Sequence, residues 1–422
     1  MKALTKISIG FLALAAAALW FTSCSSEDVA SGTNQGKMSS LTLTINTGKS
    51  MGSRATWTTD PAGNENDINR ITVGIFSADG NTLRTIVELA SGDGTNNTFK
   101  PETKGASTTI VTNSLTDGDL IKVAVNAPKG HFVGIKTAND FMNKSEEAKD
   151  ALTNSTDLTK EACNNNVPMY GQGTLTPTTP NDNSAFKVSG DKVTVKHMLA
   201  KVTLESLKVD FKAGSAYANA EFTPVAAFLI NVPDKMDFTT AVWNSSAALL
   251  HGWSAYDTSD ATNCTFNYAA GNTGSGTYAR YLTTEDLTPA TALSGSATSP
   301  AKAWFYTLPN DRVESATATD NTKLVIAGTF IENKSATSST AEMVYYSLPI
   351  NATYDASQHK YVKPANGDGS AFQVCPNQNY KCSVIIRTKG SNNPNTNLTP
   401  QEAEIKVEVT DFVDVTQSAE FN

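Results

Sequence analysis

The chain has 422 residues, enough for two or three domains of ordinary size. Charged residues make up 18% of the sequence and the formal net charge is -8, which argues against a binder of nucleic acid or of an anionic membrane surface. After the N-terminal segment, no stretch is apolar for long enough to cross a bilayer.

The N-terminal segment, residues 1–23, has the layout of a secretory signal peptide. Lys2 and Lys6 precede an apolar run from Ile7 to Phe21, and small residues follow that run. Cys24 comes next, in a context that resembles the lipid-attachment site of bacterial lipoproteins, and an acidic stretch follows it. We therefore predict that Cys24 becomes the lipidated first residue. A plain signal peptide and a membrane anchor helix are the alternatives.

The chemistry-bearing residues of the remaining chain form no recognisable site. Four cysteines are too few for a disulfide scaffold of this length, and whether Cys375 and Cys382 pair across a bend is open. No Cys-x-x-Cys pair or histidine cluster suggests a metal, and no Gly-x-Ser-x-Gly turn suggests a nucleophile, so we expect neither cofactor nor metal and no enzyme. The other cysteines and the histidines are Cys163, Cys264, His131, His197, His251 and His359.

Alternation of apolar and polar residues predicts strands along the first half of the chain. Leu41, Leu43 and Ile45 alternate with polar residues, and the same period of two recurs at 71–75 and at 121–125. One helix is predicted over 138–152, where apolar residues share a face. Residues 153–192 are rich in Asn, Thr, Pro and Gly and are predicted to be loop and linker.

The strand pattern resumes at Val193 and continues to the C-terminus. Val202 and Leu204 alternate, and Leu207 and Val209 continue in a shifted phase. Residues 251–300 are poor in apolar side chains and are predicted to form long loops. Many short strands with turn signals predict an all-β (minor α) fold with two β-sandwiches that divide near residue 190. The further strand candidates are 224–232, 303–308, 323–331, 343–350 and 380–387.

The C-terminal segment carries the longest alternating pattern, over about 17 residues from Ile405. Ordinary strands have about 3–10 residues, and at about 3.3 Å per residue this one would reach roughly 55 Å. Such a strand either crosses both sandwiches of its own chain or leaves to complete a neighbour. The alternative is two consecutive terminal strands, bent at Thr410–Asp411, in the second domain. The preceding segment, 389–394, is predicted to be a flexible connector.

A set of short motifs, in this order, resembles the fimbrillins of Bacteroidales, the major subunits of type V pili. Each motif is weak alone, but their order and spacing together are fairly specific. His197 stands where the family usually has Arg, and the usual terminal Trp pair is absent. The motifs are the lipobox, Gly52-Ser53-Arg54-Ala55, Val167-Pro168-Met169-Tyr170-Gly171, the segment from Val195 to Val202, Asn379-Tyr380-Lys381 and the Val-Glu-Val-Thr terminal strand.

The resemblance implies two transthyretin-like β-sandwich domains in tandem. It places a lipoprotein signal peptide at 1–23, a propeptide with the first strand at 24–54, an N-terminal domain at 55–190 and a C-terminal domain at 191–422 that ends in a donor strand at about 403–422. Localisation would be the outer membrane and cell surface, in a fimbrium that supports adhesion and biofilm formation.

The resemblance also implies an assembly mechanism. A processing protease would cut between Arg54 and Ala55, and the first strand with Leu41, Leu43 and Ile45 would leave its groove. The partners are then other copies of the same chain, accessory and tip pilins, the protease and, in the precursor, the lipid anchor. The donor strand of another copy would fill the groove with Ile405, Val407, Val409, Val413 and Val415.

A glycan-binding surface lipoprotein of a nutrient-uptake system is the alternative function. It would share the signal, the β-domains and the polar surface, and it would need exposed aromatic platforms. Neither the Arg54 site nor the long terminal strand is needed by a glycan binder, and both favour the fimbrial interpretation. The available tryptophans are Trp57, Trp243, Trp253 and Trp304.

Overall fold

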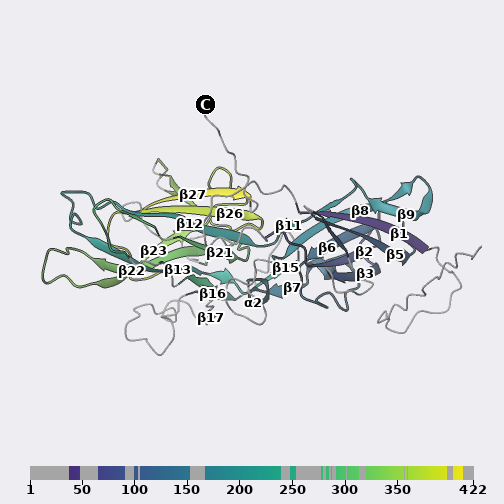
Figure 1. Cartoon of the computed structure of the whole chain (residues 1–422), viewed down its shortest axis with the longest axis horizontal. Helices are drawn as coiled ribbons and strands as arrows, with labels where there is room; N and C mark the ends of the chain where they lie inside the picture. The colour runs from purple at the N-terminus through teal and green to yellow at the C-terminus, as the bar shows by residue number, and fades with distance from the viewer. Residues whose placement is uncertain are drawn as a thin grey trace, which may run out of the picture. The chain divides into compact units, whose positions relative to one another are not determined.

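The computed structural model of the chain is built almost entirely of β-strands (Figure 1). Every described residue lies in one compact unit, Lys37–Asn422. Among the described residues, no helix is long and apolar enough to span a membrane. The structure describes residues 38–47, 65–90, 99–102, 105–152, 167–238, 248–252, 277–278, 282–284, 287, 291–300, 302–312, 320–355, 357–358, 360–396 and 403–411.

Apart from the short strand β7 (Ser145–Glu147), the strands before residue 198 form one ten-stranded sheet that folds over on itself at β8 (Met169–Thr179). The first part of β8 pairs with β6 and the second part, from Leu175, pairs with β9. The strand order is β3-β2-β6-β8-β9-β1-β5-β4, with β10 paired to β1 and β11 to β8. The other strands are β1 (Met38–Asn46), β2 (Arg70–Phe76), β3 (Leu83–Ala90), β4 (Lys100–Glu102), β5 (Gly105–Asn113), β6 (Leu120–Val125), β9 (Asp182–Val188), β10 (Val193–Thr194) and β11 (Lys196–His197).

One apolar cluster fills the space between the two faces of this folded sheet. It joins Leu43 of β1 to Val73 of β2 and Val123 of β6, and all three side chains are fully buried. Alternate residues of β1 face this core, as expected for a half-buried strand.

Two five-stranded sheets follow, and a second apolar cluster lies between them. One has the order β20-β12-β26-β27 with β21 on β12; the other has the order β18-β13-β22-β23 with β19 on β13. Figure 1 shows β26 and β27 side by side in yellow. The bounds are β12 (Ala200–Val209), β20 (Thr298–Ser299), β21 (Ala303–Thr307), β26 (Gln378–Ile386), β27 (Ala403–Asp411), β13 (Glu221–Ile230), β18 (Thr283–Thr284), β19 (Leu293–Ser294), β22 (Lys323–Ile331) and β23 (Glu342–Pro349).

These sheets confirm the prediction of an all-β fold with minor helix, built as β-sandwiches. The phase shift predicted in β12 is also present, because the ladder with β26 changes register between Leu204 and Ser206. The smaller elements are β7 (Ser145–Glu147) with β15 (Lys235–Asp237), β14 (Val232–Pro233) with β16 (Leu249–His251) and β17 (Thr277–Tyr278), β24 (Thr353–Asp355) with β25 (Lys360–Val362), and helices α1 (Ala138–Met142) and α2 (Ala148–Leu152).

The single helix predicted over 138–152 is wrong. The chain forms α1, then β7, then α2. Helix α1 starts at a capping box between Thr137 and Asp140 and ends after one turn at Asn143. β7 pairs with β15, so a strand pairing between segments far apart in sequence overrides the local helical pattern.

The loop predicted over 153–192 is wrong for residues 169–188, which form the β8–β9 hairpin. The glycines that suggested a loop are required by packing. A Cβ atom at Gly171 would lie 2.6 Å from the backbone oxygen of Thr194 and 2.8 Å from a methyl group of Val193. Gly171 therefore marks a close approach of β8 to β10 within the sheet.

Glu146 on β7 predicts an unusual pH dependence of stability. Its side chain is buried and Oε2 has no hydrogen-bond partner among the described residues. Burial, and secondly the charge of Asp150, raises the pKa from 4.5 to about 8. The folded chain therefore holds a proton that the unfolded chain releases near pH 4.5, so stability falls as the pH rises from about 4.5 to 8.

We expect Glu146→Gln to remove this decline, a difference of roughly 2–5 kcal/mol between the two ends of the window. Urea unfolding of the parent and the variant at several pH values measures it. Glu147→Gln, at the exposed neighbouring position, is the matched control and should keep the parental slope. Parallel curves for the parent and Glu146→Gln would contradict the assignment.

Candidate strand-exchange site

β1 is an interior strand of the ten-stranded sheet. All nine of its residues pair antiparallel with β5, from Met38 opposite Asn113 to Asn46 opposite Gly105. On the other side β1 runs parallel to β9 and then to β10. In the strand order, β1 is the link that joins β5 and β4 to β9.

The inward side chains of β1 belong to the core of the folded sheet. Leu41, Leu43 and Ile45 are 0%, 0% and 1% exposed. Burying a side chain of this size contributes roughly 1.5–3 kcal/mol. The inward face ends in polar residues, Ser39 and Thr47, and the Ser39 hydroxyl donates to the backbone oxygen of Asn183 at 2.7 Å.

Removing β1 would leave a slot with two unpaired edges and an apolar floor. The backbone of β5 would lose nine paired residues on one side, and β9 and β10 would lose their partner on the other. Unpaired buried backbone groups and exposed apolar side chains both cost free energy, so an empty slot favours any strand that fits it. The fit is close, because a Cβ atom at Gly105 would lie 1.9 Å from the oxygen of Ile45.

β27 is the last described strand, and it lies at one end of its sheet path, paired with β26 of the same chain. Ile405 and Val409 are part of this ladder, and the Val407 side chain is 5% exposed. In this structure, residues 403–411 therefore complete a sheet of their own chain. Transfer of this strand to another copy stays a prediction.

The connector between β26 and β27 is held in place, contrary to the prediction for residues 389–394. Ser391 and Tyr345 exchange two backbone hydrogen bonds, so the connector runs beside β23 of the other sheet. Lys323, which is fully buried, donates to the backbone oxygen of Asn395, and the Asn231 amide donates to the Asn395 side chain. The connector is therefore attached to the β22–β23 sheet as far as Asn395.

A buried ion pair joins Glu65, the first described residue after the predicted cleavage site, to Lys201 of β12. The Glu65 carboxylate accepts from Lys201 Nζ at 2.9 Å and from the Tyr306 hydroxyl at 2.7 Å. The carboxylate is 1% exposed and the ammonium 2% exposed, and the Lys201 Nζ atom lies 5.7 Å from the centre of the Trp304 ring. Removing one partner of such a pair costs about 3–5 kcal/mol, so Glu65 is a strong point of attachment.

Sequence reasoning identified Leu41, Leu43 and Ile45, and the structure brings them together on one buried strand. It missed β5 and Glu65. The first half of β5, Gly-Ala-Ser-Thr-Thr, has no apolar alternation, and Glu65 has no motif around it. Cys24, Arg54, Ala55, Val413 and Val415 lie outside the described residues.

Three other kinds of site can be assessed in the part of the chain that the structure describes: a metal centre, the two cysteines and an aromatic platform. No group of three or more potential ligands there is arranged to hold a metal ion. Cys375 and Cys382 are free thiols, and burial raises the pKa of Cys382 to about 12. Trp304 is 8% exposed, so it is not an exposed aromatic platform.

Comparisons with known proteins show a family match for part of the chain and a shared fold for most of it. A family model described as major fimbrial subunit protein (FimA) matches residues 39–206, a stretch that contains β1 and its neighbours. No curated protein sequence matches the chain.

Three solved structures share the fold. A fimbrilin from Porphyromonas gingivalis W83 has a TM-score of 0.58 at 16% identity, covering 91% of this chain and 99% of that chain. A candidate cell adhesion protein from Parabacteroides distasonis has 0.59 at 16%, covering 89% and 100%. Another from Bacteroides eggerthii has 0.57 at 18%, covering 90% and 98%.

These findings define the chain as an all-β protein with the fold of a solved fimbrilin, and its residues 39–206 as similar to the major fimbrial subunit family. The resemblance to the fimbrillins of Bacteroidales that the sequence indicated is confirmed, by the family model over residues 39–206 and by the shared fold of a solved fimbrilin.

Leu43, at the centre of β1, gives a direct measure of how strongly the first strand supports the precursor. Leu43→Ala should lower the free energy of unfolding by about 2–5 kcal/mol, because it removes apolar contacts and leaves a cavity. Thr42→Ala, on the exposed face of the same strand, should change it by less than about 0.5 kcal/mol. Urea unfolding of the uncleaved chain measures both, and equal effects would show that β1 does not contribute to the core.

Proposed function

We propose that this chain is the structural subunit of a surface fimbria and polymerises by strand exchange. The precursor keeps its own β1 in the slot until a protease cuts between Arg54 and Ala55. The strand then leaves, and the terminal strand of another copy enters. The observation that carries the proposal is the position of β1, an interior strand next to the proposed cut with a fully buried apolar face.

The filament follows from the geometry of the two partners. The slot and the terminal strand are different surfaces of one chain, so each copy accepts one strand and donates another. Adding a strand to two open edges is a form of β-augmentation, in which backbone hydrogen bonds hold the strand and alternate side chains select it. Ile405, Val407 and Val409 repeat the spacing of Leu41, Leu43 and Ile45, and Val413 and Val415 extend it.

The layout of the precursor belongs to the same proposal. Residues 1–23 are the signal, 24–54 the propeptide, 55–190 the first domain and 191–422 the second. Lipidation of Cys24 brings the precursor to the outer membrane, and cleavage separates the mature chain from the lipid. Accessory and tip pilins are further partners, and adhesion and biofilm formation follow from the filament.

A glycan-binding surface protein remains the second candidate function. It would need exposed aromatic rings, and burial of Trp304 removes one of the four tryptophans it had available. Trp57, Trp243 and Trp253 lie outside the described residues.

Two disulfide locks test strand exchange from its two sides. Ser40 and Val111 are directly opposite in the β1–β5 ladder and both point away from the core, so Ser40→Cys/Val111→Cys should bind β1 to its slot. Ile385→Cys/Glu404→Cys should bind β27 to β26 in the same way.

We expect the cleaved, oxidised first lock to form no filaments and the reduced protein to form them at the parental level, as counted by electron microscopy. The second lock should behave likewise if residues 403–411 leave β26, and should polymerise if only later residues are donated. Each single cysteine variant is the control. Filaments from the oxidised first lock would contradict the exchange.

If Cys24 is lipidated and the chain is then cut after Arg54, the lipid and the N-terminal segment should be lost together. The precursor should carry a palmitate label at Cys24, and filaments should carry none and begin at Ala55. Metabolic labelling with N-terminal sequencing of both fractions measures this. Arg54→Gln should keep the label and lose the filaments, whereas labelled filaments beginning at Cys24 would rule out the model.

A further inference from the structure

The acceptor strand β5 depends on β1 for most of its length. Its other neighbour, β4, pairs only with Gly105, Ala106 and Ser107. In the described ladders, the remaining residues, 108–113, have β1 as their strand partner. When β1 leaves, residues 109–113 of β5 have no described strand on either side, although Ile110 must keep its place in the core.

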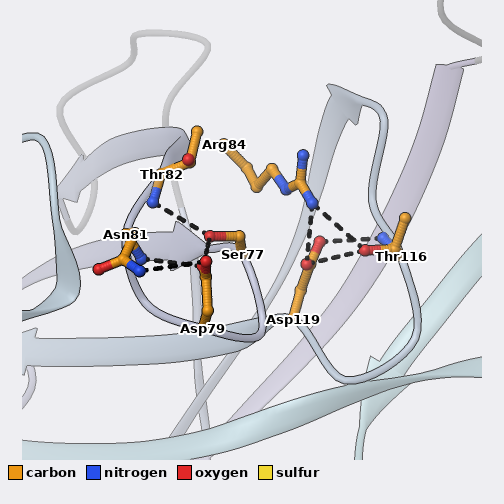
Figure 2. Close-up of polar contacts among 7 residues, drawn as sticks. All are labelled: Ser77, Asp79, Asn81, Thr82, Arg84, Thr116 and Asp119. Carbon is orange, nitrogen blue, oxygen red and sulfur yellow. Dashed lines mark hydrogen bonds and ion pairs between the residues drawn. The ribbon is translucent and has the colours of Figure 1, made fainter.

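The turn that follows β5 is fastened by a buried carboxylate, Asp119. Its side chain is 0% exposed. One oxygen accepts from the Thr116 backbone amide at 2.9 Å, and the other accepts from the Thr116 hydroxyl at 2.8 Å and from Arg84 Nη2 at 3.4 Å. Figure 2 shows Arg84 reaching from the neighbouring strand β3 to this turn.

Backbone hydrogen bonds attach the same turn to Leu175, where the partner of β8 changes from β6 to β9. Gly118 donates to the oxygen of Leu175 at 3.0 Å, and Leu175 donates to the oxygen of Asp119 at 2.8 Å. Leu115, between β5 and these contacts, is 2% exposed in the core. The turn thus has partners on β3 and β8, neither of which leaves with β1.

We propose that the Arg84–Thr116–Asp119 cluster is a latch that keeps β5 in place while the slot is empty, so that the slot remains able to accept a strand. This inference rests on the proposed strand exchange and adds positioning residues to it. In the precursor, nine paired residues hold β5 beside β1 and the latch adds little to its position. After cleavage, the latch is what fixes the end of β5 that has lost its ladder.

The test compares the precursor with the empty slot. The chain is cleaved with trypsin, the product is defined by mass spectrometry, and binding of a fluorescent peptide with the sequence of residues 38–47 is measured. This peptide probes the slot itself and does not depend on which strand another copy donates. Asp119→Ala should lower the peptide affinity at least tenfold, while the melting temperature of the uncleaved chain falls by less than about 5 °C.

Asp79→Ala is the matched control. Asp79 caps the neighbouring turn through Asn81 and Ser77, as Figure 2 shows, and within the described part of the chain it makes no hydrogen bond or ion pair with the turn after β5. Its affinity for the peptide should match that of the parent. Arg84→Met, a milder change at a half-exposed side chain, should weaken binding about threefold. Binding of Asp119→Ala within twofold of the parent, or equal losses in Asp79→Ala and Asp119→Ala, would overturn the latch.

A second measurement separates failure of the latch from failure of strand exchange. If the cleaved parent keeps its first strand and never binds the peptide, the proposed function fails. The latch is then judged in uncleaved Leu43→Ala, where β1 is loosened in place, by hydrogen exchange of the amides of residues 108–113. Asp119→Ala should speed this exchange at least tenfold more than Asp79→Ala does, and equal rates would overturn the latch.

Discussion

A strand inside a sheet supplies hydrogen bonds to both neighbours, and β1 does so for β5 on one side and for β9 and β10 on the other. The same strand places Leu41, Leu43 and Ile45 in the core. These two contributions cannot be separated, because the pleat that directs alternate side chains inward also aligns the backbone groups with both edges. The ten-stranded sheet therefore needs a strand at this position, although the ladder and the core do not require that it come from the same chain.

The rest of the molecule is arranged so that one strand can leave without loss of the others. Glu65 is joined to Lys201 and Tyr306 by buried contacts that do not involve β1. At the other end of the chain, Asn395 is attached to Lys323 before the terminal strand begins. Along the chain, a residue with such an attachment thus follows the first segment proposed to move and another precedes the second. Because a buried ion pair is costly to break, the attachment at Glu65 should outlast the departure of β1.

Strand positions with strong alternation were predictable from the sequence, and those set by distant contacts were not. Residues 41–45 and 71–75 have a clear period of two, and both lie in strands. The β8–β9 hairpin was missed because glycines stand where apolar residues would show the alternation. At Gly171 the backbone of Thr194 comes close, and at Gly173 the side chain of Val188 does. β7 was missed because its partner, β15, lies about ninety residues further along the chain. The inward residues of β1 were predictable, but the two edges that hold them were not, since β5 carries little pattern of its own.

The central claim is that the place of β1 is taken by the terminal strand of another copy. One population of the chain carries Thr109→Cys, opposite the middle of β1, and a second carries a cysteine at one of the even positions from 404 to 410; both carry Cys375→Ser. The two are mixed, cleaved after Arg54 and oxidised, and cross-linked pairs are identified by mass spectrometry. We expect disulfides between the two populations in filaments only. They should form at those positions of the terminal strand that lie opposite residue 109 in a single strand register. Filaments that form without any such cross-link would contradict it.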